Sequence, residues 1–85
     1  MKNDHIVVNI HPFVIQQEVD VYSNGECIQT VKCKLDELKD TIFALSKQHN
    51  IQQIDLAGNQ LYAMRLRDDL GAGKYVTAGM SIKIH

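Results

Sequence analysis

The chain has 85 residues, which suits one domain around a single core and leaves no room for a separate catalytic domain. Hydrophobic residues make up 45% and charged residues 22%, which is typical of a folded globular protein and disfavours the disordered and membrane-spanning classes. The formal net charge of -1 lacks the basic excess of proteins that bind nucleic acid through its phosphates, and the first ten residues show no secretory pattern, so we expect a cytoplasmic protein.

The N-terminal part of the chain predicts two strands in succession. Residues 6–10 are β-branched and apolar except at Asn9, which indicates a central strand covered on both faces. Residues 14–22 alternate between apolar and polar side chains, which indicates a half-buried strand. Its apolar residues Ile15, Val19 and Val21 are expected on one face of the strand.

A hairpin and a helix are expected next. Asn24-Gly25 favours a two-residue turn of type I′, which leads into an antiparallel third strand, Glu26–Lys34. Asp36 is a good N-cap, and the apolar residues after it recur at steps of three and four, so an amphipathic helix follows. Asn50 suits a left-handed C-cap and predicts where this helix ends.

The rest of the chain predicts a strand, a helix and a final strand. Residues 51–57 form the fourth strand, and Gly58 makes the turn after it. Asn59 can cap a second helix, Gln60–Leu70. Residues 75–85 alternate again, so the chain ends as a strand.

These elements predict an α/β (α+β) domain of order β-β-β-α-β-α-β with one mixed five-stranded sheet. Two right-handed crossovers after a meander give the spatial strand order 3-2-1-4-5. This topology resembles the ribonuclease H-like fold without its terminal helix, and the resemblance covers almost the whole chain. A ferredoxin-like split sheet is the alternative, if the first two segments merge into one bent strand.

The ribonuclease H resemblance implies carboxylates that bridge two magnesium ions, on the first strand, the first helix, the end of the fourth strand and usually the last helix, which is missing here. The first strand offers Asn9 instead of an acid, and only Asp55 on the fourth strand matches. The acids Asp36, Glu37 and Asp40 are explained by the dipole at the start of the first helix. We therefore expect no enzyme activity and assign no catalytic residues.

Neither a metal ion nor a cofactor is expected. The four histidines show no ligand spacing on one element. Cys27 and Cys33 lie roughly 20 Å apart on an extended strand, which is beyond disulfide reach, so both are expected to be free thiols.

Asp55 and the turn after it are the candidate ligand-binding residues. In the expected strand order Asp55 neighbours Asn9, so it forms a hydrogen bond with Asn9 across the sheet or serves as a ligand-binding group. Gly58, Asn59 and Gln60 place backbone amides at a helix start beyond a parallel strand, where anions bind in many α/β proteins. A purely structural helix cap is the alternative.

Two features near the C-terminus complete the candidates. The "GAGK" sequence at residues 71–74 follows a helix and lacks two residues of a phosphate loop, so it is interpreted as a helix end and a turn. Met80, Ile82 and Ile84 share one side of an expected edge strand. Such an edge pairs readily with another chain, so these residues are the expected interface of a homodimer or of strand addition to a partner.

The segments "NIHPF", "DVYSNGEC", "LDELKDTIFAL" and "IDLAGNQLYA" resemble a family of small proteins encoded by phages and related mobile elements of Gram-positive bacteria. The resemblance implies a compact accessory protein that inhibits or modulates a host protein, such as a defence protein, by direct binding in the host cytoplasm. We therefore expect a non-enzymatic, dimeric interaction module. The alternatives are a small-molecule or nucleotide binder that uses Asp55 and Gly58-Asn59, and a minimal nucleic-acid-binding domain, which the few aromatic residues disfavour.

Overall fold

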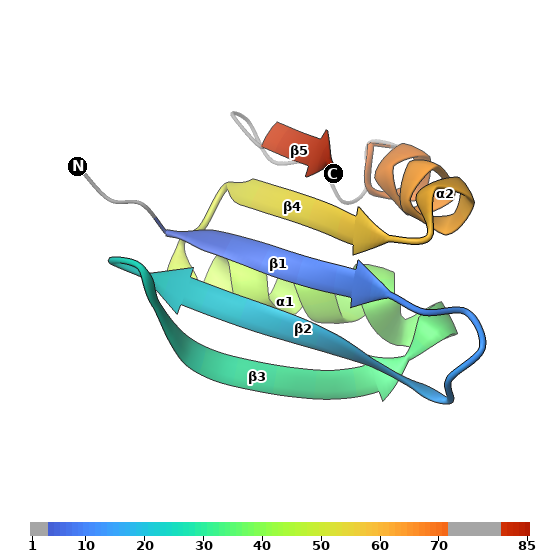
Figure 1. The fold of residues 1–85 in the computed structure, drawn as a ribbon. Helices are drawn as coiled ribbons and strands as arrows, with labels where there is room; N and C mark the ends of the chain where they lie inside the picture. Colours follow the sequence, from blue (N-terminus) through green and yellow to red (C-terminus); the bar gives the residue numbers. More distant parts are fainter. Residues whose placement is uncertain (1–3, 72–80) are drawn as a thin grey trace.

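The computed structural model describes residues 4–71 and 81–85, which form one sheet and two helices (Figure 1). The sheet has the order β3-β2-β1-β4-β5, as the sequence predicts, and β1 and β2 are separate strands, so the ferredoxin-like alternative is wrong. A 3-10 turn, η1, precedes the first helix. The elements are β1 (His5–Ile10), β2 (Gln16–Ser23), β3 (Glu26–Lys34), η1 (Leu35–Glu37), α1 (Leu38–His49), β4 (Gln53–Gly58), α2 (Gln60–Leu70) and β5 (Ser81–Ile84).

The strand pairing places the ends of two central strands side by side. β1 is antiparallel to β2 and parallel to β4, and β4 is parallel to β5. Ile10, the last residue of β1, lies opposite Gly58, the last residue of β4. The β1–β2 loop and the start of α2 therefore leave the sheet at the same end, on the right of Figure 1.

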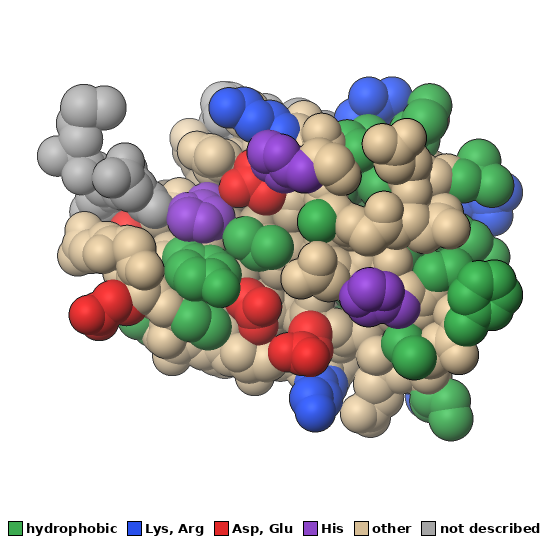
Figure 2. Space-filling model, in the orientation of Figure 1, with side chains coloured by type: hydrophobic (Ala, Val, Ile, Leu, Met, Phe, Trp, Pro, Cys, Tyr) green, Lys and Arg blue, Asp and Glu red, His purple; other side chains and the backbone are tan. Residues whose placement is uncertain are grey.

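The core lies on one face of the sheet. Helix α1 lies behind the sheet in Figure 1, and α2 packs against β4 and β5. Within β1 the side chains of Ile6, Val8 and Ile10 are fully buried, whereas Val7 and Asn9 point to the other face and are only half-buried. The expectation that this strand is covered on both faces is wrong, because both helices of the described residues pack on the same core. Figure 2 shows the open face, which carries acidic and histidine side chains.

The turn and cap residues mostly adopt the expected backbone. Asn24 has φ 54° and Gly25 has φ 82°, which the type I′ hairpin requires. Asn50 ends α1 in the left-handed region, with φ 53° and ψ 46°. Asn and Gly tolerate positive φ, and the sequence places them where the backbone requires it.

The start of α1 differs from the prediction. Asp36 lies inside η1 and is not the N-cap. The Glu37 carboxylate instead accepts a hydrogen bond of 3.0 Å from the backbone N–H of Lys34. The 3-10 turn thus begins at Leu35, two residues earlier than an Asp36 cap would allow, and the Glu37 side chain satisfies a backbone donor there.

Cys27 is exposed and Cys33 is buried, and both are free thiols as expected. No helix in the described part of the chain is long and apolar enough to cross a membrane.

Candidate protein-interaction surface

The loop between β1 and β2 exposes three consecutive apolar side chains, which we call the apolar loop (Phe13, Val14 and Ile15). Phe13 is 97% exposed, Ile15 84% and Val14 51%. The prediction that Ile15 lies on the buried face of the second strand with Val19 and Val21 is wrong, because β2 begins only at Gln16. Single exposed apolar residues are common, but a contiguous exposed group is a candidate interaction site.

A buried glutamine holds this loop in one conformation. The side chain of Gln17 is fully buried. Its Oε1 accepts a hydrogen bond of 2.6 Å from the backbone N–H of His11, and its Nε2 donates to the carbonyls of His11 at 2.8 Å and Val14 at 3.2 Å. The backbone N–H of Val14 closes a turn on the His11 carbonyl at 3.1 Å. The apolar loop is therefore preorganised, which lowers the entropy cost of binding.

More exposed apolar residues lie at the same end of the molecule. Helix α2 begins beside the β1–β2 loop and exposes Leu61 by 66% and Met64 by 48%. Figure 2 shows hydrophobic side chains gathered along the edge where this loop and α2 lie. Apolar residues exposed on two elements thus occur together on one end of the domain.

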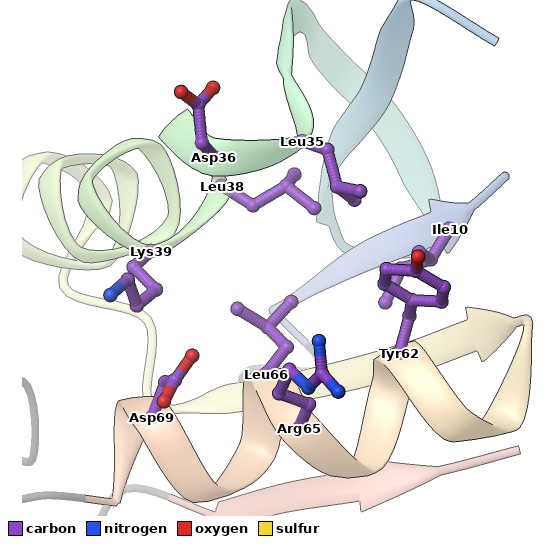
Figure 3. Close-up of a pocket in the computed structure, with 9 residues that line it drawn as sticks. All are labelled: Ile10, Leu35, Asp36, Leu38, Lys39, Tyr62, Arg65, Leu66 and Asp69. Carbon is purple, nitrogen blue, oxygen red and sulfur yellow. The ribbon is translucent and has the colours of Figure 1, made fainter. Parts of the chain in front are cut away.

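A cleft of about 470 Å³ opens between α1 and α2 (Figure 3). Its interior is aliphatic, and Figure 3 shows the side chains of Leu35, Leu38 and Leu66 directed toward the space between the helices. The wall formed by α2 carries Arg65, whose guanidinium lies 5.8 Å from the ring centroid of Tyr62. The full lining consists of Ile10, Leu35, Asp36, Leu38, Lys39, Tyr62, Arg65, Leu66 and Asp69.

The charged side chains of the cleft lie on both of its walls. Each wall contributes one acid and one base, Asp36 with Lys39 on the η1–α1 side and Asp69 with Arg65 on the α2 side. An aliphatic interior with charged groups at its margin accommodates an apolar group and orients polar groups around it.

The turn predicted as an anion site serves as the joint between β4 and α2. Gly58 has φ 95°, and a Cβ atom there would overlap the backbone of Ile10, at 2.7 Å from its nitrogen. The backbone N–H of Asn59 donates to the Ile10 carbonyl at 2.9 Å, and its Oδ1 accepts from the backbone N–H of Tyr62 at 3.2 Å. Asn59 is thus the predicted N-cap. Gln60 is exposed, and none of these three predicted residues lines the cleft.

Asp55 does not pair with Asn9. The register places Asp55 opposite Val7, and Asn9 opposite Ala57. In the described part of the chain, Asp55 Oδ1 is buried without a hydrogen bond, and the Nε2 atom of His85 lies 3.3 Å from it. That distance makes an ion pair only when His85 is protonated. The predicted Asn9–Asp55 hydrogen bond is wrong, because the strands pair two residues out of the expected register.

The predicted interface on the last strand is only partly described. Met80 lies outside the described residues. Ile82 and Ile84 are half-buried and pack against the protein's own core, so they face inward from β5. Strand β5 is the edge of the described sheet, and its role as an interface stays a prediction.

Of the "GAGK" segment only Gly71 lies within the described residues. Gly71 is the C-cap of α2, and its backbone N–H donates to the Arg67 carbonyl at 2.9 Å, which confirms the predicted helix end. Within the described ranges no group of three or more His, Cys, Asp or Glu side chains could hold a metal ion.

Comparison with protein families, with curated proteins and with solved structures finds no match for this chain. The sequence does not predict the apolar loop directly. Two residues hint at it, because Pro12 interrupts the strand pattern and Gln17 stands where the alternation with Val19 and Val21 calls for an apolar residue. These two residues are the signal that could have identified it.

Proposed function

We propose that this protein is a non-enzymatic interaction module that binds another protein through the apolar loop and the adjoining cleft. The observation that carries the proposal is the exposure of Phe13 and Ile15 on a loop that the buried Gln17 holds in place. Binding energy at protein interfaces concentrates in a few well-packed residues, among which aromatic ones are enriched. A fixed loop with an aromatic tip has the properties of such an anchor.

The resemblance to phage and mobile-element proteins supports a host protein as the partner, bound in the host cytoplasm and modulated or inhibited by the contact. The alternation of acidic and basic side chains around the cleft also favours a protein surface over nucleic acid, which needs a basic patch.

Affinity capture from a bacterial lysate with mass spectrometry tests this proposal. The wild-type chain is compared with a Phe13→Ser, Ile15→Ser double variant. A matched control is Ile28→Ser, which replaces a residue that is 51% exposed on β3, away from the loop. Truncation of an interface hot spot costs about 2 kcal/mol or more, or roughly 30-fold in affinity, so the captured protein should disappear only with the double variant. Capture that survives the double substitution would rule the proposal out.

A small-molecule site in the cleft is the second candidate. Its volume of about 470 Å³ falls within the range of ligand pockets. A ligand that binds only the folded state raises the melting temperature by mass action, so thermal denaturation with nucleotides and small apolar acids tests it. Leu35→Glu, which places a charge in the aliphatic interior, should abolish any such shift.

A further inference from the structure

We infer that the cleft between α1 and α2 receives the apolar loop of a second copy of this chain, in a dimer with two-fold symmetry. The inference rests on the proposed function, because it assigns an occupant to the same interaction surface. A host protein that binds this surface would then compete with the second copy.

The loop and the cleft complement each other in shape and polarity. Phe13 is 97% exposed, so it does not fill the cleft of its own chain. The cleft has an aliphatic interior of about 470 Å³, which gives an aromatic side chain ample room. Moving Phe13 from water into this interior removes about 150–250 Å² of surface from solvent, which is the main driving force for association.

The positions of loop and cleft favour closed two-fold symmetry. Ile10 lines the cleft and directly precedes the β1–β2 loop. At the other end of the loop, Gln16 pairs with Lys34, the residue before the cleft residue Leu35. Because both parts of the contact lie at one end of the domain, one two-fold axis brings each loop to the other cleft. A loop and a cleft at opposite ends would instead build an open chain of copies.

The charges around the cleft are compatible with a second copy. The acids Asp36 and Asp69 balance the bases Lys39 and Arg65, so the formal charge of the margin is zero. Two such margins face each other without net repulsion, and each base of one copy has acids available on the other. The exposed Leu61 and Met64 of α2 lie at the same end and extend the contact toward the roughly 800 Å² per partner of a stable interface.

Sedimentation equilibrium of the full chain tests the inference. The wild type should be a dimer, whereas Phe13→Asp and Leu35→Glu should each weaken dimerisation at least 30-fold. Ile28→Asp on β3 is the matched control and should leave the dimer intact. Circular dichroism checks the folding of each variant. If Leu35→Glu does not fold, Arg65→Glu at the exposed margin replaces it, because it makes both margins acidic and should also weaken the dimer.

Mixing the variants separates a loop-in-cleft contact from a loop-to-loop contact. Phe13→Asp keeps an intact cleft and Leu35→Glu keeps an intact loop, so their mixture should form a heterodimer with one of the two contacts. Native mass spectrometry resolves it from the two homodimers. A mixture without a heterodimer, while both variants remain folded, would overturn the arrangement.

Two results distinguish failure of this inference from failure of the proposed function. A wild-type chain that is monomeric at high concentration, or a dimer that survives both substitutions, overturns the inference alone. The proposed function falls only if capture of a partner is insensitive to the loop substitutions.

Discussion

Replacement of Gln17 by leucine should destabilise the domain although it puts an apolar side chain in a fully buried position. In the wild type the Gln17 amide satisfies the N–H and carbonyl of His11 and the carbonyl of Val14. Leucine has a similar size but neither donates nor accepts a hydrogen bond. The substitution therefore removes a polar anchor from the loop while it preserves most of the packing.

The magnitude follows from these three hydrogen bonds. A net contribution of about 0.5–1.5 kcal/mol each gives roughly 1.5–4.5 kcal/mol together. Because the loop borders solvent, water replaces part of this loss, and the expected decrease in the free energy of unfolding is about 2–3 kcal/mol. For a domain of this size that corresponds to a fall of about 10–20 °C in melting temperature.

Urea and thermal unfolding followed by circular dichroism measure the loss. Gln16→Leu is the matched control, because Gln16 is the adjacent residue, is exposed and lies on the opposite side of β2. Its stability should change by no more than about 0.5 kcal/mol. Hydrogen exchange at the Val14 amide should accelerate in Gln17→Leu but not in the control. If the two variants were equally stable, the claim that Gln17 fixes the loop would be wrong.

Three further substitutions test the joint after β4 and the open face. Gly58→Ala should lower the free energy of unfolding in urea by roughly 2 kcal/mol or more, because it combines a positive φ with a clash against the backbone of Ile10. Gly25→Ala is the control. It has φ 82° but no atom within 4 Å of the added Cβ, so it should cost only about 1 kcal/mol. Asn59→Ala should lower stability by about 1 kcal/mol through loss of the N-cap, with Asn59→Gly closer to wild type. Asp55→Asn should leave the melting temperature unchanged or raise it, because it neutralises a buried oxygen without a hydrogen bond, and a clear fall would show that the contact with His85 at 3.3 Å stabilises the fold.

The features that sequence predicts best are those whose cause is local. Asn24-Gly25, Asn50 and Asn59 each meet a backbone requirement that involves only their immediate neighbours. The strand order also follows from simple rules, since right-handed crossovers leave few arrangements for the elements in this order.

The errors arise where a partner distant in sequence decides the outcome. The strand order alone predicts Asn9 as the neighbour of Asp55, but the parallel register that sets this neighbour depends on where each strand begins. The cleft has no sequence signal. Leu38 and Leu66 belong to the apolar faces of α1 and α2, and the apolar pattern is the same whether the two helices pack closely or leave a space between them.

The β1–β2 loop inverts the usual distribution of residues, since its polar anchor Gln17 is buried and its apolar residues Phe13 and Ile15 are exposed. A loop that only connected two strands would need neither feature, because polar side chains in water would serve the connection and leave the backbone hydrated. Fixing the backbone also costs conformational entropy. Holding exposed apolar side chains in one place has an effect only on a molecule that touches them, so this inversion is the physical argument for the interface proposed at this end of the domain.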